Sequence, residues 1–269
     1  SGVSQRPSLV TMNWRLCVFL IGFHHHQLCH ALLETCSLIV VQNLSCSDFL
    51  DEFREKRPFI LRDDAVLRLE QNSEFQKRSS VNLLVEAYGE SQVVLSASNS
   101  ISHRKKSVRF ADYVSSLSPV DADQSADSIW YQFGDHNYSQ WDSLFEHYVK
   151  PTVIECDEAQ GMEIAYSFGL GHTGSGVPFH VHSSVFAEVI QGSKRWFLYP
   201  PDAIPLFDPN ATSQKWVRDI YPDLSETEKP FECVCHPGDL IYIPSHWWHA
   251  TLNEGLTVFI SSFMADKFS

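Results

Sequence analysis

The chain is predicted to fold as a mainly β domain with flanking helices, on three observations. From residue 161 onward, short apolar runs are separated by turn residues, which is typical of a β-sandwich or barrel. Between residues 45 and 160, apolar residues recur mostly at helical spacing. The chain has 269 residues, of which 43% are apolar and 20% charged, so it can bury one sizeable core.

The segment from residue 45 to 160 is expected to buttress the barrel. Ser47 or Asp48 caps a first helix that Pro58 ends, and a short strand follows over residues 59–61. Further helices are expected over residues 65–87, 108–117 and 139–148, with a strand over 93–97. No repeat or low-complexity linker follows this segment, so we expect it to form a single domain with the barrel over residues 32–269.

The barrel core is assigned to residues 161–264. Its strand candidates are the apolar runs at residues 164–170, 185–190, 195–199, 231–234, 240–243 and 256–263. Pro237 and Gly238 form a turn between two of these runs, because proline fixes φ and glycine accepts a positive φ. We therefore expect helices packed around a β-barrel.

The first 31 residues have a different character and are expected to be a leader. Arg6 and Arg15 are their only charged residues, and Arg15 is followed by an apolar run from Leu16 to Phe23. This arrangement predicts a secretory signal peptide over residues 12–31. We therefore expect the protein in the secretory pathway, in the lumen of the endoplasmic reticulum.

Three Asn-X-Ser/Thr sequons accompany this leader, at Asn43, Asn137 and Asn210. In a lumenal protein each sequon is an acceptor for N-linked sugar, which requires a position on the surface. Five cysteines lie beyond the leader, and an odd number leaves at least one of them unpaired within the chain. Their spacing does not determine which cysteines pair.

The charge balance limits the class of partner. The chain has 20 basic and 33 acidic residues, which gives a formal net charge of −13. Such a chain does not release counterions from a phosphate backbone, so we expect no nucleic acid partner. The charge is compatible with a protein partner or a protein substrate. No apolar run reaches the roughly 18 residues of a spanning helix, so no membrane span is predicted.

Three histidines, His180, His182 and His249, form a candidate metal site. His180 and His182 flank a single residue beside a strand-like run, so their imidazoles point to one face about 7 Å apart. His249 lies 69 residues after His180. Imidazole is a common ligand of iron and zinc. A polar, solvent-facing strand is the alternative interpretation of the pair.

Three motifs surround these histidines in order: GSGVPFHVH at residues 174–182, GSKRWFLYPP at 192–201 and GDLIYIPSHWWH at 238–249. This series resembles the JmjC, cupin-like family of iron and 2-oxoglutarate oxygenases. The resemblance covers about residues 45–264. It implies a double-stranded β-helix of the jelly-roll or cupin type, with the metal inside one mouth of the barrel.

The resemblance also implies a binding site for 2-oxoglutarate beside Fe(II). Lys194 matches the lysine that binds the distal carboxylate of the co-substrate, and Tyr131 matches a hydroxyl donor to the same carboxylate. Lys194 and Arg195 face opposite sides of their strand, so only one of them points inward. By the resemblance, that residue is Lys194.

The chain departs from the family pattern at the metal. The family holds Fe(II) with His-x-Asp/Glu and a second histidine, and here His182 stands at the carboxylate position. Glu188 has the right parity but lies about 20 Å farther along an uninterrupted strand, so it is rejected as a ligand. A third neutral imidazole raises the charge of a divalent site from +1 to +2, and three imidazoles with an open position also suit Zn²⁺.

Two further positions depart where the family usually places hydrogen-bonding residues beside the co-substrate: Val177 precedes the first ligand, and Val185 and Phe186 stand five and six residues after it. Two hypotheses therefore remain. The first is a lumenal JmjC-domain protein whose variant His-x-His…His site makes it a non-catalytic or weakly active regulatory module that binds a protein. The alternative is a protein hydroxylase of the secretory pathway that depends on Fe(II) and 2-oxoglutarate.

Overall fold

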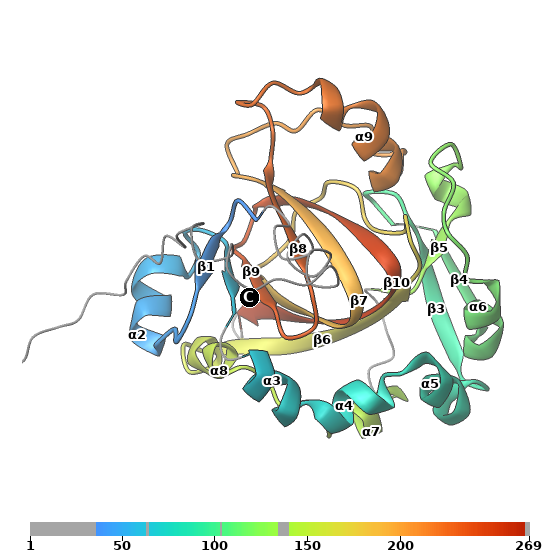
Figure 1. Cartoon of the computed structure of the whole chain (residues 1–269), viewed down its shortest axis with the longest axis horizontal. Coiled ribbons are helices and arrows are strands. Elements are labelled where there is room, and N and C mark those ends of the chain that lie inside the picture. Colours follow the sequence, from blue (N-terminus) through green and yellow to red (C-terminus); the bar gives the residue numbers. More distant parts are fainter. Residues whose placement is uncertain (1–35, 63–64, 103, 134–139, 267–269) are drawn as a thin grey trace, which may run out of the picture. The chain divides into compact units, whose positions relative to one another are not determined.

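Two long strands, β7 (Val185–Tyr199) and β10 (Trp248–Asp266), form the frame of the fold in the computed structural model. They pair antiparallel in two stretches, separated by register shifts near Val258. Gly192 and Gly255 lie at this interruption with φ values of +78° and +81°. Glycine accepts such backbone angles without strain, so both long strands can bend there and curl the sheet into a barrel (Figure 1).

The remaining strands add to this frame in two sheets. The larger sheet has the order β1-β2-β9-β7-β10-β6, with β8 paired to β7. Its other members are β1 (Ile39–Val41), β2 (Phe59–Leu61), β6 (Met162–Gly171), β8 (Phe231–Cys235) and β9 (Leu240–Ile243). The smaller sheet has the order β4-β3-β5 and consists of β3 (Gln92–Ala97), β4 (Lys105–Arg109) and β5 (Trp130–Tyr131).

Short helices surround the sheets, and most of them come from the first half of the chain. They are α2 (Cys46–Asp48), α3 (Ala65–Gln71), α4 (Ser73–Arg78), α5 (Val81–Tyr88), α6 (Phe110–Ser116), α7 (Asp142–Phe145), α8 (Thr152–Glu158) and α9 (Ser213–Asp219). A π-helical turn, η2 (Phe49–Phe53), and two 3₁₀ turns, η3 (Ala126–Ser128) and η5 (Tyr221–Asp223), complete the set. Figure 1 shows α3, α4 and α5 following one another along one side of the barrel.

A buried apolar cluster fills the barrel between its layers. It includes Val185 and Ala187 from the first part of β7, Trp196 and Leu198 from the second part, and Cys235 from β8. Strands β8 and β9 contribute to the same cluster although β8 pairs with β7 at residues 194–198 and β9 at residues 185–188. The mainly β fold with flanking helices, of the jelly-roll type, is therefore confirmed.

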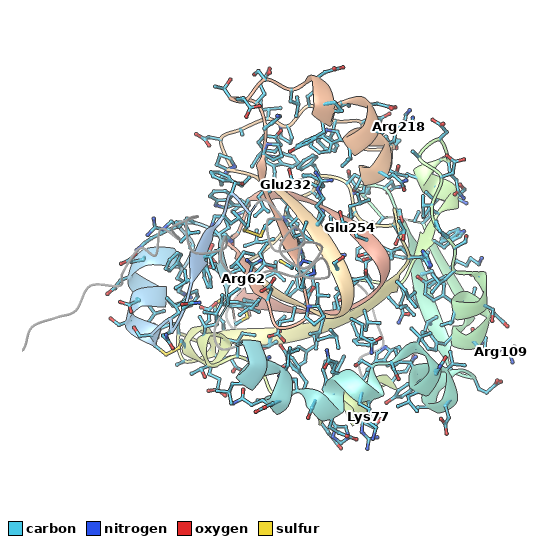
Figure 2. All side chains as sticks on the ribbon, in the orientation of Figure 1. Arg62, Lys77, Arg109, Arg218, Glu232 and Glu254 are labelled. Carbon is cyan, nitrogen blue, oxygen red and sulfur yellow. A yellow bond between two sulfur atoms is a disulfide. The ribbon has the colours of Figure 1, made fainter. Side chains whose placement is uncertain are left out.

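Two disulfide bonds tie peripheral segments to the barrel region. Cys36 is bonded to Cys233 in β8, and Cys46 in α2 is bonded to Cys156 in α8. They close long separations of 197 and 110 residues along the chain, and yellow bonds mark them in Figure 2. Cys235 is the unpaired cysteine among the described residues, and it is buried.

The structure describes residues 36–62, 65–102, 104–133 and 140–266. The predicted signal peptide over residues 12–31 and the sequon at Asn137 lie outside them. Among the described residues, none of the helices has the length and the apolar character needed to cross a membrane.

Some predicted elements differ from the observed ones. The first helix is capped by Ser45, whose Oγ accepts from the Asp48 N–H at 3.1 Å, so neither Ser47 nor Asp48 is the cap. The helix expected over residues 139–148 is reduced to α7, because only Leu144 and its neighbours in the middle complete a helical turn. The runs at 185–190 and 195–199 form one strand, because Gly192 carries the bend inside it.

Candidate metal centre

His180 and His249 are brought together by the pairing of two chain segments. The segment that precedes β7 runs antiparallel to the start of β10, and the backbones of His180 and His249 exchange hydrogen bonds of 3.1 and 3.0 Å. Gly176 permits this approach, since a Cβ there would lie 2.0 Å from the carbonyl oxygen of Thr251. The two rings come to lie with their centroids 4.2 Å apart.

His182 joins this pair from the turn that leads into β7. Its ring centroid lies 4.4 Å from that of His249 and 5.3 Å from that of His180. One nitrogen of each ring lies within 4.8 Å of the others, so the three imidazoles face a common point. The His182 carbonyl accepts from the His246 N–H at 3.0 Å, which fixes the turn.

The outer nitrogen of each imidazole contacts a backbone carbonyl. Nδ1 of His180 lies 2.8 Å from the Pro178 oxygen, Nδ1 of His182 lies 2.6 Å from the Ser183 oxygen, and Nδ1 of His249 lies 2.9 Å from the Trp247 oxygen. A carbonyl only accepts, so each Nδ1 carries the proton and each neutral ring keeps a lone pair on Nε2. Hydrogen bonds of this kind orient metal-ligating histidines.

Two of these lone pairs approach closely. Nε2 of His182 and Nε2 of His249 are 2.9 Å apart, yet neither is a donor when both Nδ1 atoms are protonated. Nitrogen ligands about 2.1 Å from an octahedral ion have a similar separation, about 3.0 Å. A bound cation would therefore stabilise this close contact between the two Nε2 atoms.

Burial keeps the three rings neutral. Burial, with a smaller contribution from the neighbouring His182, lowers the pKa of His180 to about 3. Burial also lowers the pKa of His182, and it holds the pKa of His249 well below its usual value, with added repulsion from His180. Neutral imidazole is the form that binds a metal, so the site is ready for one near neutral pH.

Lys194 lies inside the barrel as predicted from the family resemblance. Its side chain is buried, and its Nζ donates to the Tyr131 hydroxyl at 2.8 Å and to Oδ1 of Asn253 at 3.0 Å. Burial lowers the pKa of Lys194 to about 7. The ion pairs observed between described residues do not include Lys194, whereas Arg195 faces outward and pairs with Glu232 at 2.6 Å. Figure 2 labels Glu232 at this position.

Asn253 is a site residue that the sequence patterns did not identify. It lies opposite Lys194 in the β7–β10 register, and its Nδ2 donates to Ser175 Oγ at 3.0 Å. Only its position opposite Lys194 could have identified it. That pairing depends on how β7 and β10 bend at Gly192 and Gly255. Asn253 and Tyr131 together orient the ammonium group of Lys194.

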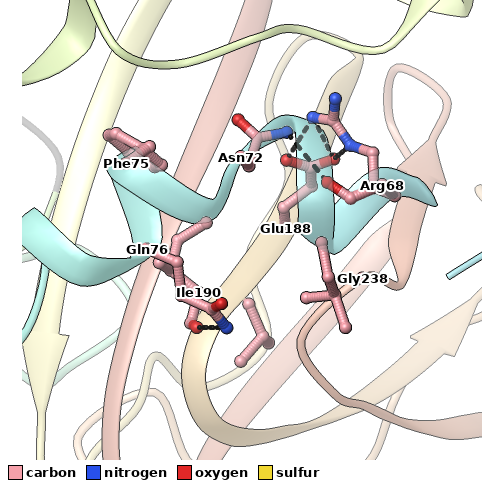
Figure 3. A pocket seen from close by; sticks show the side chains of 9 residues that line it. Arg68, Asn72, Phe75, Gln76, Glu188, Ile190 and Gly238 are labelled. Atoms are coloured by element: carbon pink, nitrogen blue, oxygen red, sulfur yellow. Dashed lines mark hydrogen bonds and ion pairs between the residues drawn. The ribbon is translucent and has the colours of Figure 1, made fainter. Parts of the chain in front are cut away.

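Glu188 lies outside the site, in agreement with its rejection as a ligand. Its carboxylate forms a bidentate ion pair with Arg68 of α3, with distances of 2.7 and 2.8 Å to Nη2 (Figure 3). Asn72 and Gln76 line the same small pocket between α3, α4 and β7. This pair anchors the helical buttress to the barrel.

Two of the three predicted glycosylation sites lie among the described residues. Asn43 and Asn210 are exposed, as an acceptor of sugar must be. His246 lies in the turn before β10 with a φ of +64°, outside the group of three histidines.

A model of the cupin-like domain family matches residues 48–268 of the chain. The chain is also 40% identical, over 232 residues, to JmjC domain-containing protein 8 from Mus musculus and from Homo sapiens. The matches cover 86% of this chain and 83% and 84% of those relatives. The chain belongs to the cupin-like JmjC family.

Two further proteins match over less of their own length. Lysine-specific demethylase JMJ21 of Arabidopsis thaliana is 29% identical over 248 residues, which cover 84% of this chain and 25% of the plant protein. A solved structure of E. coli ycfD gives a TM-score of 0.48 at 16% identity, covering 83% of this chain and 53% of that one.

Within this JmjC domain, the two valines that depart from the family pattern are packing residues. Val177 is buried against Tyr131 and Phe259. Val185 belongs to the apolar cluster that fills the barrel. Neither side chain offers a hydrogen bond to a polar ligand, in contrast to Lys194 and its two partners, Tyr131 and Asn253.

Proposed function

We propose that this JmjC protein holds a divalent metal on His180, His182 and His249, and that it acts in the lumen of the secretory pathway as a regulatory module that binds a protein, with little or no oxygenase turnover. The observation that carries this proposal is the third imidazole. His182 takes the carboxylate position of the family with its Nε2 2.9 Å from Nε2 of His249, inside the ligand set.

The donor set fits a divalent metal. Three neutral imidazoles suit Fe²⁺ and Zn²⁺, and three ligands leave other coordination positions open. Without a carboxylate the centre keeps the full +2 charge of the ion, which disfavours further oxidation of iron relative to a site with an anionic ligand. In JmjC proteins Fe(II), with 2-oxoglutarate, supplies the oxidising chemistry when it is bound. This variant set therefore favours metal binding with weak turnover.

The placement in the secretory pathway is supported by the covalent chemistry of the described residues. Two disulfides, Cys36–Cys233 and Cys46–Cys156, join distant parts of the chain, and such bonds persist in oxidising compartments. Protein made in secretory cells should begin near Leu32 and carry sugar on at least one of Asn43, Asn137 and Asn210. An intact, unglycosylated chain in mass spectra would contradict this placement.

The buried cation supports the alternative function, a protein hydroxylase that depends on Fe(II) and 2-oxoglutarate. Lys194 is held by Tyr131 and Asn253, two neutral partners, so a carboxylate could be its counter-ion. One relative, from Gallus gallus, is named 2-oxoglutarate and iron-dependent oxygenase JMJD4, and it is 32% identical over 105 residues, covering 34% of this chain and 24% of that protein.

Metal analysis combined with 2-oxoglutarate turnover tests the proposal. We expect the purified protein to contain a divalent metal without measurable consumption of 2-oxoglutarate. His182→Asp restores two histidines and one carboxylate, so it should raise Fe(II) retention and the rate of 2-oxoglutarate decarboxylation. Robust turnover by the unmodified protein, lost on His182→Asp substitution, would establish the hydroxylase instead. A metal-free protein that stays metal-free under Fe(II) and Zn(II) would overturn both functions.

A further inference from the structure

The indole of Trp196 is a buried hydrogen-bond donor inside the barrel. The residue is 5% exposed, and among the described residues its Nε1–H has no hydrogen-bond partner. A buried N–H without an acceptor costs free energy, because folding removes its bond to water, and native structures contain few of them. An unpaired donor at this position therefore suggests an acceptor that does not belong to the chain.

Trp196 lies near both the histidine cluster and Lys194. Its ring centroid is 6.3 Å from that of His249, and Nζ of Lys194 lies 5.8 Å from the same indole. Lys194 and Trp196 are two residues apart on β7, so their side chains share the inner face of the strand. A molecule that extends from the histidine cluster to the ammonium group of Lys194 therefore passes beside the indole.

We propose that Trp196 is a ligand-binding residue whose Nε1–H donates a hydrogen bond to a carboxylate oxygen of a 2-oxo dicarboxylic acid held between the metal and Lys194. This inference rests on the metal site of the proposed function, and it adds a binding residue to it. It also explains how a site with Val177 and Val185 can still recognise a polar ligand: the indole supplies a donor that these two side chains do not.

The chain contains a matched control for this donor. Trp216 of α9 is also buried, at 4% exposure, but its Nε1–H donates to the Leu206 carbonyl at 2.8 Å. It packs in a different cluster, with Phe179 and Phe197, outside the barrel interior. Replacing either tryptophan by phenylalanine keeps an aromatic ring and removes the N–H, so the two variants differ in which hydrogen bond is lost.

The test is calorimetric titration of Zn-loaded protein with 2-oxoglutarate, because zinc is redox-inactive and prevents turnover. We expect Trp196→Phe to weaken binding by about tenfold, the usual loss for one buried hydrogen bond to a charged group. Trp216→Phe should leave the affinity unchanged. Metal content and melting curves of the same samples show whether each variant is folded and loaded.

A second readout uses unmodified protein with ¹⁵N-labelled tryptophan. The Trp196 indole resonance, identified by its loss in Trp196→Phe, should shift on addition of 2-oxoglutarate, while the Trp216 resonance stays in place. Binding of equal strength in Trp196→Phe, or an unshifted Trp196 resonance, would overturn the inference while leaving the metal site intact. Zn-loaded protein that does not bind 2-oxoglutarate at all would also overturn it, whereas failure to load metal would overturn the proposed function itself.

Discussion

Different groups hold the side chains in place at the two ends of the site. At the metal end, backbone carbonyls fix all three imidazoles, and the chain departs from the JmjC pattern at His182. At the inner end, the polar side chains of Tyr131 and Asn253 hold Lys194, and the family lysine is kept. The candidate metal ligands depart from the family pattern at one end, while the lysine position of the family is kept at the other.

From this difference we expect that metal binding and co-substrate binding can be separated in this barrel. A bound cation would relieve the contact between two Nε2 lone pairs, whereas a bound anion would balance the charge of a protonated Lys194. Each of these interactions is local, so variants at one end should spare the binding property of the other. The following experiments test that separation.

The largest effect is expected for His249→Ala, which removes the ligand shared by both close ring contacts. Loss of one of three imidazoles should reduce metal affinity by more than about a hundredfold. Metal analysis after dialysis measures this loss. His246→Asn is the control, because His246 lies in the turn just before β10, outside the ligand group, and asparagine tolerates its positive φ. Metal retained by a folded His249→Ala variant would show that His249 is no ligand.

A smaller effect, at the other end, is expected for Lys194→Met. The pKa of Lys194 is about 7 in the folded protein, below its usual value of 10.5. Between pH 7 and pH 10.5, Lys194 is protonated in the unfolded chain but mostly neutral in the folded chain. The free energy of unfolding therefore rises with pH in this range. Below pH 7 both states are protonated and the burial penalty is fully present.

Lys194→Met should remove that component while metal content is unchanged. The difference in unfolding free energy between unmodified protein and variant should rise by on the order of 2 kcal/mol from pH 7 to pH 9. Denaturant titrations at several pH values measure it. A pH-independent difference would show that Lys194 keeps its usual pKa, and metal loss in the variant would show that the two ends are coupled.

Much of the fold was predictable because its periodicities are local. The barrel strands from residue 161 onward follow apolar runs, and β2 and β3 lie where expected. The errors arose where tertiary contacts override local pattern. Trp141 and Tyr148 lie at helical spacing with buried or half-buried side chains, yet α7 includes only Asp142–Phe145 between them. Their apolar stripe therefore indicated burial more reliably than helix length.

The site was predictable to the extent that ordered motifs carry it. His180, His182 and Lys194 lie in two such motifs, and the structure brings the three histidines together. Asn253 was missed because its role depends on the register between β7 and β10, which the bend near Gly255 sets. The unpaired donor of Trp196 could not be predicted from the sequence either, because only the packed structure shows which polar atoms lack a partner.

The smallest effect is expected for Asn253→Ala, which tests how the inner end is held. Oδ1 of Asn253 accepts from Lys194, and Nδ2 donates to Ser175. Truncation leaves the ammonium with Tyr131 as its remaining hydrogen-bond partner, so the folded protein should lose about 1 kcal/mol, and the pKa of Lys194 should fall further. A less protonated lysine binds a carboxylate less well at neutral pH, so 2-oxoglutarate affinity should decrease and recover at lower pH.

Asn99→Ala is the matched control for this last change. Asn99 is also buried, but its side chain caps a distant loop through the Ile101 and Ser102 N–H groups. Both variants should lower the melting temperature, while only Asn253→Ala should alter the pH dependence of 2-oxoglutarate binding. Equal binding curves for the two variants would show that Asn253 supports the barrel without tuning Lys194. A loss of metal in Asn253→Ala would instead mean that the hydrogen bonds around Lys194 also help to position the histidines.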